Sequence, residues 1–377
     1  MEKTLKRYGS VAENETAAQS SFPFERLPKE CQICVFSFLN AIEKARLSSV
    51  CKTWNELMVT PRLWSFADFS LLSPCQCGAA GYRRPLLSCD KCVNRCPSDY
   101  LLFKKRAYHY VAHLAFRKAI LKKLQFQFDL QEDEEVWLKM LLYAINMTNV
   151  RELAVVECSW TVTREKPSSL YATEDFLEGK KHERVRAFQK LLKALTMRSE
   201  MVHTFRFEFD WSDLSIDLLS SFKHIRHLEL YRIWVYKSIS QNRINRLLRD
   251  MELLESLKLE IWIPYQPGSV HPQYSMMSKS LKCLNIALCK GLFLGSVNLP
   301  NLEMLIIARL PWTGPLLPAN AIKITCLYEV LSQGAPRLQR INHHFLEEDW
   351  RTSCYPALDD QLKHSCYCTK HKKGWAL

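Results

Sequence analysis

A single apolar spacing recurs along the second half of this 377-residue chain. Three large apolar residues follow the order apolar-x-x-apolar-x-apolar, which places the last two on one face of a short strand. The copies are Val150/Leu153/Val155, Val202/Phe205/Phe207, Ile225/Leu228/Leu230, Leu254/Leu257/Leu259, Leu281/Leu284/Ile286 and Leu302/Leu305/Ile307, with Leu338/Ile341 as an incomplete copy. Because one such unit cannot bury its apolar face alone, the pattern predicts parallel strands that stack side by side, with helices outside them.

The distances between copies indicate the kind of repeat. Successive triplets begin 52, 23, 29, 27 and 21 residues apart, and most of these steps fit a unit of about 20 to 29 residues. The region resembles degenerate leucine-rich repeats, and the resemblance implies a curved solenoid of parallel strands with outer helices. The 52-residue step leaves room for one strand that the sequence does not reveal.

On a solenoid of this class the outward residues of the strands form the concave surface that usually meets a target. Those positions include Arg206, Glu208, Glu229, Tyr231, Lys258 and Glu260. Their charges are mixed, whereas a nucleic-acid surface needs a basic stripe along one face. The strand residues therefore predict a protein target.

A second apolar segment lies near the N-terminus, at residues 22–64. Pro28 suits the first turn of a helix, Asn40 interrupts the apolar run that follows, and Pro61 ends a further stretch with helical spacing. The segment predicts three short helices. A unit of this size buries too little surface to be stable alone, so we expect another domain or another chain to cover part of it.

The same segment resembles the F-box. The matching elements are Leu27-Pro28, Val35-Phe36-Ser37-Phe38-Leu39, Val50-Cys51-Lys52-Thr53-Trp54 and Leu63-Trp64, although Ala41-Ile42-Glu43 stands where an acidic residue usually opens the second helix, which predicts a weaker cap there. The resemblance implies that the segment binds a Skp-family adaptor of a cullin-RING ubiquitin ligase. The expected adaptor-binding residues are Leu27, Pro28, Ile33, Phe36, Leu39, Val50, Trp54 and Leu63.

The chain has 15 cysteines, and two groups of them have spacings that suit a metal. Cys75, Cys77, Cys89 and Cys92 could hold one structural zinc ion, with free thiols in a loop as the equally weighted alternative. Five cysteines between 75 and 96 cannot supply the two ligand sets of a RING domain. The tail residues His364, Cys366, Cys368 and His371, with Cys354 upstream, favour an exposed tail with chance cysteines, because loops this short strain a tetrahedral site.

The formal net charge is +13, and seven basic residues fall within residues 101–128 before the first acid at Asp129. We expect this stretch to be a solvated helix that links the F-box to the repeats. We find no apolar run long enough to span a membrane and no secretory signal, so we expect the protein in the cytoplasm, the nucleus or both.

The predicted fold is α/β, with a three-helix F-box followed by a curved leucine-rich-repeat-like solenoid. The expected divisions are a flexible N-terminus at 1–21, the F-box at 22–70, a cysteine-rich insert at 71–100, a basic linker helix region at 101–145, the repeats at 146–345 and a tail at 346–377. With only 10 glycines and no phosphate-binding loop, a nucleotide-dependent enzyme is disfavoured.

The sequence therefore predicts a non-catalytic adaptor, the substrate-recognition subunit of a Skp-cullin-F-box ubiquitin ligase. Its partners would be a Skp-family adaptor, a cullin-RING ligase and a protein target of unknown identity. Two alternatives stay open. One is a leucine-rich-repeat scaffold that does not direct ubiquitylation, and the other is a zinc-dependent nucleic-acid binder that uses residues 75–125.

Overall fold

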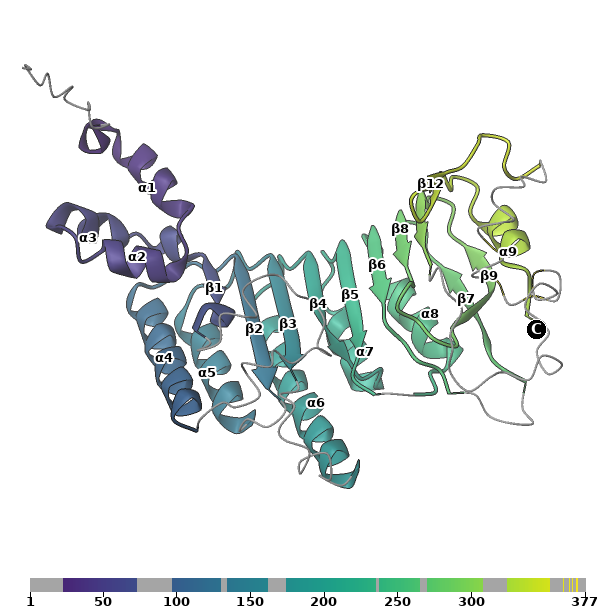
Figure 1. Cartoon of the computed structure of the whole chain (residues 1–377), viewed down its shortest axis with the longest axis horizontal. Coiled ribbons are helices and arrows are strands. Elements are labelled where there is room, and N and C mark those ends of the chain that lie inside the picture. The colour runs from purple at the N-terminus through teal and green to yellow at the C-terminus, as the bar shows by residue number, and fades with distance from the viewer. Residues whose placement is uncertain are drawn as a thin grey trace, which may run out of the picture. The chain divides into compact units, whose positions relative to one another are not determined.

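A computed structural model gives the fold of the chain. It describes residues 23–72, 97–129, 134–161, 174–234, 237–264, 270–307 and 324–352, together with residues 362, 366, 368 and 371. The chain divides into two compact units, Met1–Leu57 and Met58–Leu377. In the described part of the chain, the first unit consists of helices and the second of strands with outer helices (Figure 1).

The first unit contains a short 3-10 turn and the helices of the N-terminal segment. These are η1 (Phe24–Arg26), α1 (Lys29–Ser37), α2 (Ala41–Leu47) and α3 (Lys52–Met58), and α3 ends at the first residue of the second unit. Pro28 stands at the N-cap of α1, as its missing N–H suggests. The predicted three short helices are confirmed.

Asn40 and Glu43 fix the start of α2. Asn40 Oδ1 accepts a hydrogen bond from the Glu43 N–H at 2.9 Å, and Glu43 Oε2 accepts one from the Asn40 N–H at 2.8 Å. Two N–H groups that the helix leaves unpaired are thus satisfied reciprocally, which is the arrangement called a capping box. The expectation of a weak cap is therefore wrong, because Asn40 supplies the oxygen that an acidic residue would.

The second unit is built on one open sheet. Its strands are β1 (Phe66–Asp68), β2 (Lys123–Asp129), β3 (Val155–Thr161), β4 (Thr204–Phe209), β5 (His227–Arg232), β6 (Ser256–Leu259), β8 (Cys283–Asn285), β10 (Met304–Ile306), β11 (Arg340–Ile341) and β12 (His344–Phe345), adjacent in that order. All neighbouring pairs are parallel except β11 and β12. The predicted α/β fold, with a sheet of parallel strands after the N-terminal helices, is confirmed, and the described sheet does not close into a barrel.

One row of apolar side chains crosses the whole of this sheet. In register from β1 to β11 it contains Ala67, Leu124, Val156, Phe205, Leu228, Leu257, Leu284, Leu305 and Ile341, each at most 1% exposed. Full burial of a side chain such as Leu stabilises the fold by about 1.5–3 kcal/mol. The row forms the centre of the core, and the predicted triplets from Val202 onward supply its members from Phe205 to Ile341.

The structure corrects the first part of the repeat pattern. The triplet placed at Val150 is shifted, because Leu153, Val156 and Cys158 have the same spacing and are all buried, whereas Val155 is only half-buried. The strand expected within the 52-residue step does not exist in the described sheet, since β3 pairs directly with β4. Two copies were missed instead, and they are Trp64/Ala67/Phe69 at β1 and Leu121/Leu124/Phe126 at β2.

Helices line one side of the sheet (Figure 1). They are α4 (Pro97–Phe116), α5 (Glu134–Met147), α6 (Glu174–Thr196), α7 (Asp213–Ser220) and α8 (Gln241–Asp250), and each contacts the next along the row. The continuous helix expected over the basic stretch is wrong at its C-terminal end. Lys118 adopts a positive φ of 50°, the Ala119 N–H bonds back to Leu114 O at 3.0 Å, and the chain then enters β2.

The outer layer changes near the C-terminus. There β7 (Gln273–Met277) and β9 (Phe293–Asn298) form a small parallel sheet that contacts α8 through β7 and α9 (Leu327–Gly334) through β9. Gly334 allows α9 to approach β9 closely, because a side chain at that position would overlap the Val297 carbonyl.

The last repeat is covered by the residues that follow it. Trp350 is 3% exposed, and its indole Nε1 donates to Leu338 O at 3.1 Å. Tyr328 of α9 donates its hydroxyl to Trp350 O at 3.1 Å. The segment after β12 thus closes one end of the core, as terminal units of stacked repeats must.

Candidate functional site

The helices of the first unit leave many apolar side chains open to solvent. Phe38 is 85% exposed, Val50 61%, Val35 47% and Ile42 36%, and the described surface also includes Cys31, Cys34 and Cys51. Isolated exposed apolar residues are ordinary, whereas several of them in one small helical segment are typical of a protein contact surface.

The predicted adaptor-binding residues occupy three kinds of position. Pro28 and Val50 are exposed, Leu27, Ile33, Leu39 and Trp54 are half-buried, and Phe36 and Leu63 are buried at 3% and 1%. Leu63 lies in η2 (Pro61–Trp64), within the second unit. Adaptor binding by these eight residues stays a prediction. Phe38, the most exposed of the large apolar side chains in the described part of the segment, belongs to the matching motif but not to the predicted set.

Three aromatic rings explain why Phe36 and Trp54 are withdrawn from the surface. The ring centroid of Phe36 lies 5.1 Å from that of Phe24 and 5.4 Å from that of Trp54, and Phe24 and Trp54 are 5.7 Å apart. Tilted and edge-on contacts at these distances are favourable. The three rings form the small core of the first unit, so Phe36 supports the open surface rather than belonging to it.

Gln32 is a buried polar residue of the first unit that sequence reasoning missed. It is 7% exposed, and its Nε2 donates to Leu27 O at 2.8 Å and, at 3.3 Å, to Phe24 O and Glu25 O. A buried amide costs free energy unless it is hydrogen-bonded, so this geometry holds the turn before Pro28 in place.

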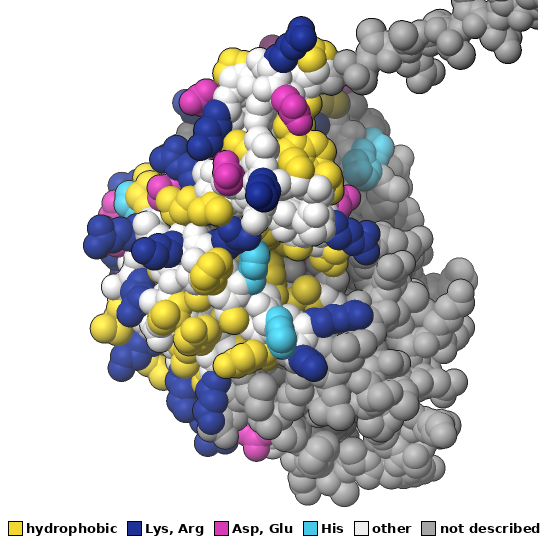
Figure 2. All heavy atoms as spheres, turned by 90° about the vertical axis from the view of Figure 1, so that its left-hand side faces the viewer, with side chains coloured by type: hydrophobic (Ala, Val, Ile, Leu, Met, Phe, Trp, Pro, Cys, Tyr) yellow, Lys and Arg dark blue, Asp and Glu magenta, His cyan; other side chains and the backbone are white. Residues whose placement is uncertain are grey.

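Figure 2 shows one side of the molecule as a surface. Hydrophobic side chains gather in several patches on it, between many Lys and Arg side chains and few acidic ones. In α4 the described basic residues Lys105 and Arg106 are exposed, as is the apolar Phe116 at 78%. No helix in the described part of the chain is both long enough and apolar enough to cross a membrane.

The strands of the large sheet carry a ladder of alternating charges on the face opposite the buried apolar row. Glu157, Arg206, Glu229 and Lys258 stand in register on β3, β4, β5 and β6. Arg206 lies 2.6 Å from Glu229 and 3.6 Å from Glu157, and Lys258 lies 3.4 Å from Glu229. Lys123 extends the ladder to β2 at 3.1 Å from Glu157. Cross-strand pairs of opposite charge stabilise a sheet, and here they also fix the side chains of the surface.

Glu229 is the most strongly held member of this ladder. Burial opposes its ionisation, but hydrogen bonds from Arg206 and Tyr231 outweigh burial and lower the pKa of Glu229 to about 2. The carboxylate is therefore charged throughout the physiological range, and its charge is balanced within the protein.

Beyond the ladder, Trp262 lies between two cations. The Arg232 guanidinium is 3.7 Å from the ring centroid and the Lys290 ammonium is 3.9 Å from it, while Arg232 also pairs with Glu260 at 2.7 Å. Cation–π contacts of this kind hold an aromatic ring rigidly at a surface. The expected mixed character of the strand face is thus present at Arg206, Glu229, Lys258 and Glu260.

The two cysteine groups have different outcomes. Cys75, Cys77, Cys89 and Cys92 lie outside the described residues. The exposed tail predicted around Cys366 is wrong, because Cys366, Cys368 and His371 are buried at 4–5% and meet Cys326, while Cys354 and His364 also lie outside the described residues. Sequence reasoning missed Cys326 because it lies 40 positions before Cys366 in the sequence. These four side chains could hold a metal ion.

Comparison with known proteins gives matches to the N-terminal segment. Residues 24–70 match the family model described as F-box-like. A curated sheep (Ovis aries) protein named F-box/LRR-repeat protein 21 is 47% identical over 45 residues, which cover 12% of this chain and 10% of that relative. The chain therefore matches only about a tenth of the relative's length. The match supports the F-box resemblance directly and the leucine-rich-repeat resemblance only through the name of the relative.

Proposed function

We propose that this protein, which carries an F-box-like domain at residues 24–70, is the substrate-recognition subunit of a Skp-cullin-F-box ubiquitin ligase. The observation that carries the proposal is the coincidence of this domain with the exposed apolar side chains of Phe38, Val35 and Val50. An apolar surface of that kind is completed when another protein covers it, and F-box domains bind Skp-type adaptors.

The strand face would hold the protein target. Its charges alternate from Glu157 to Lys258 and are paired within the sheet. A target would therefore be selected by the shape and charge order of this rigid face, rather than by a uniform basic field of the kind that binds nucleic acid.

The mechanism would be proximity rather than chemistry by this chain. The F-box-like domain would bind the adaptor of the ligase and the sheet would bind the target, which raises the effective concentration of target lysines near the conjugating enzyme. The protein would act in the cytoplasm, the nucleus or both. No residue of the chain need change its covalent state.

Co-elution with a purified Skp-family adaptor and a cullin scaffold tests the adaptor half of the proposal. Phe38→Ala should weaken adaptor binding by about tenfold or more, because an exposed aromatic anchor is lost. It should leave the fold intact, since a side chain that is 85% exposed fills no internal space. Phe116→Ala is the matched control, an aromatic residue exposed at 78% on α4.

Two outcomes would contradict the proposal. Equal adaptor binding by Phe38→Ala and the unchanged protein would reject this surface as the adaptor site. Stable binding to the adaptor without any ubiquitin transfer to proteins captured on the sheet would leave the protein as a scaffold. Measuring the ubiquitylation of captured proteins, with the unchanged protein and with Phe38→Ala, distinguishes these two outcomes from each other.

A further inference from the structure

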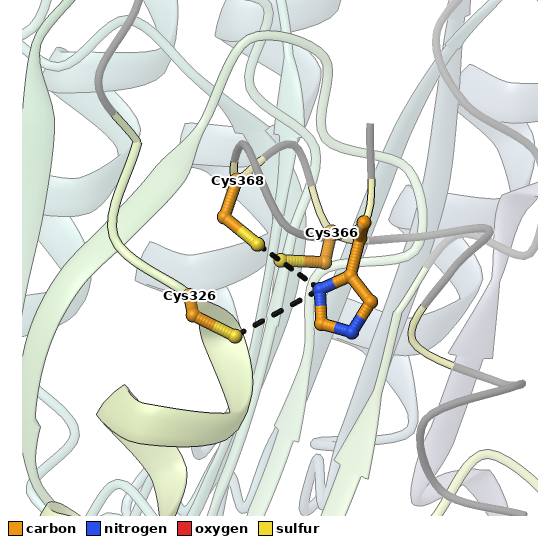
Figure 3. A group of neighbouring side chains, drawn as sticks. Cys326, Cys366 and Cys368 are labelled. Carbon is orange, nitrogen blue, oxygen red and sulfur yellow. Dashed lines mark hydrogen bonds between the residues drawn. The ribbon is translucent and has the colours of Figure 1, made fainter. Parts of the chain in front are cut away.

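Four buried side chains from two distant parts of the chain converge beside α9. Cys326 stands at the N-cap of α9, whereas Cys366, Cys368 and His371 come from the C-terminal residues (Figure 3). Their exposed fractions lie between 4% and 7%. Cysteines that occur by chance in an exposed tail would not be buried together in this way. The burial of all four side chains therefore indicates that the cluster has a structural role.

The geometry fits one tetrahedral ion. The three sulfur atoms and a histidine nitrogen lie within 4.8 Å of one another. Cys368 Sγ is 3.0 Å and Cys326 Sγ is 3.8 Å from His371 Nδ1. Zinc bonds of about 2.3 Å to sulfur and 2.0 Å to nitrogen place tetrahedral ligand atoms ~3.5–3.8 Å apart, so small side-chain adjustments complete the site.

Backbone contacts help to position the sulfur atoms of the cluster. The Leu327 N–H donates to Cys366 Sγ at 3.4 Å. Cys326 stands at the N-cap of α9, so the start of that helix fixes the position of its side chain. The close spacing of Cys366, Cys368 and His371 is tolerable because the remaining ligand comes from another segment.

We propose that Cys326, Cys366, Cys368 and His371 bind one structural zinc ion. Three thiolates and one imidazole complete the coordination, which leaves no position for substrate and makes the site structural rather than catalytic. The ion ties the C-terminal residues to the start of α9, and α9 packs on β9. The site thereby fastens the segment that closes the last repeat, a part of the fold that the proposed ligase function does not itself require.

The metal content of the purified full-length protein tests this site directly. The measurement is made in a background with Cys75, Cys77, Cys89 and Cys92 all replaced by Ser, so that any zinc held by those residues is removed. We expect about one zinc ion per chain in this background and a loss of at least tenfold on adding Cys326→Ser. Cys283→Ser, which alters a half-buried thiol on β8, is the matched control and should keep the ion.

A second pair of variants keeps the test decisive if Cys326→Ser does not fold. His371→Cys retains four zinc ligands and should keep the ion, whereas His371→Ala should lose it, with circular dichroism to show that both are folded. Cobalt added to chelator-treated protein should give the thiolate-to-metal absorption of a tetrahedral site, and the absorption should be weaker in Cys366→Ser. Zinc content that is unchanged by Cys326→Ser and His371→Ala, or a disulfide among the three cysteines in protein purified under reducing conditions, would overturn the proposal.

Discussion

Single residues on the strand face show how this sheet combines stability with a defined surface. Arg206 is shared by Glu157 on one side and Glu229 on the other, so each carboxylate is held by more than one cation of the ladder. The sequence places these residues outward, because they alternate with the buried triplet positions. It could not show that they pair, since pairing depends on the register between strands that are more than 20 residues apart.

Replacing Glu229 by Gln should destabilise the protein by about 1–3 kcal/mol at pH 7, because Arg206 and Lys258 lose a charged partner. The pKa of Glu229 is lowered to about 2 from an ordinary 4.5, so the carboxylate stabilises the fold above pH 4.5 and loses that effect as the pH falls toward 2. The stability gap between Glu229→Gln and the unchanged protein should narrow only within that acidic window.

Urea unfolding from pH 8 to pH 3 measures this gap. Glu252→Gln, which alters an exposed carboxylate, is the control and should change stability little at any pH. A gap for Glu229→Gln that already closes between pH 8 and pH 6 would show that the carboxylate is not the titrating group.

At the scale of single elements, the sequence predicted helix and strand types better than their ends. The three helices of the first unit follow from Pro28, Asn40 and Pro61, which are local signals. The end of α4 did not follow, because Lys118 adopts a left-handed conformation that glycine usually marks. The strand β2 was hidden for a related reason, since the basic residues beside Leu121 and Leu124 looked like one face of a helix.

The reciprocal cap of α2 predicts a measurable local effect. Asn40→Ala removes the oxygen that accepts from the Glu43 N–H and should destabilise α2 by about 1 kcal/mol. Amide hydrogen exchange in α2 of the full-length protein should therefore become about fivefold faster. Asn55→Ala is the control, because Asn55 is exposed within α3 and caps no helix start there. Unchanged exchange in α2 of Asn40→Ala would mean that packing rather than the cap holds that helix.

At the scale of the whole molecule, the repeat pattern predicted the sheet but not its two ends. The first two repeats were missed because Ala67 is small and because the basic residues beside Leu121 looked like one face of a helix. The C-terminal end was missed because it is closed by contacts between distant segments, such as Trp350 with Leu338 and Cys366 with Leu327. Local spacing carries no information about such contacts, so only the folded chain reveals the candidate metal site and the cover of the last repeat.

A sheet in which each repeat contacts only its neighbours should respond locally to damage at one end. Trp350→Ala removes a buried indole and its hydrogen bond to Leu338 O, and it should destabilise the C-terminal repeat by about 3–5 kcal/mol. Hydrogen exchange should accelerate in α9 and β11 while β2 to β4 keep their protection, because the apolar row around Leu124 and Phe205 is untouched.

Hydrogen exchange followed by mass spectrometry, peptide by peptide, distinguishes a local from a global response. Phe345→Ala serves as the control, since Phe345 is an aromatic residue of the same segment that is 72% exposed and should leave exchange unchanged. If Trp350→Ala accelerated exchange equally from β2 to β11, the sheet would unfold as one cooperative block, and its repeats would not behave as a linear array. If α9 and β11 alone lost protection, the C-terminal cover would act as a cap whose stability can vary without disturbing the charged face on β3 to β6.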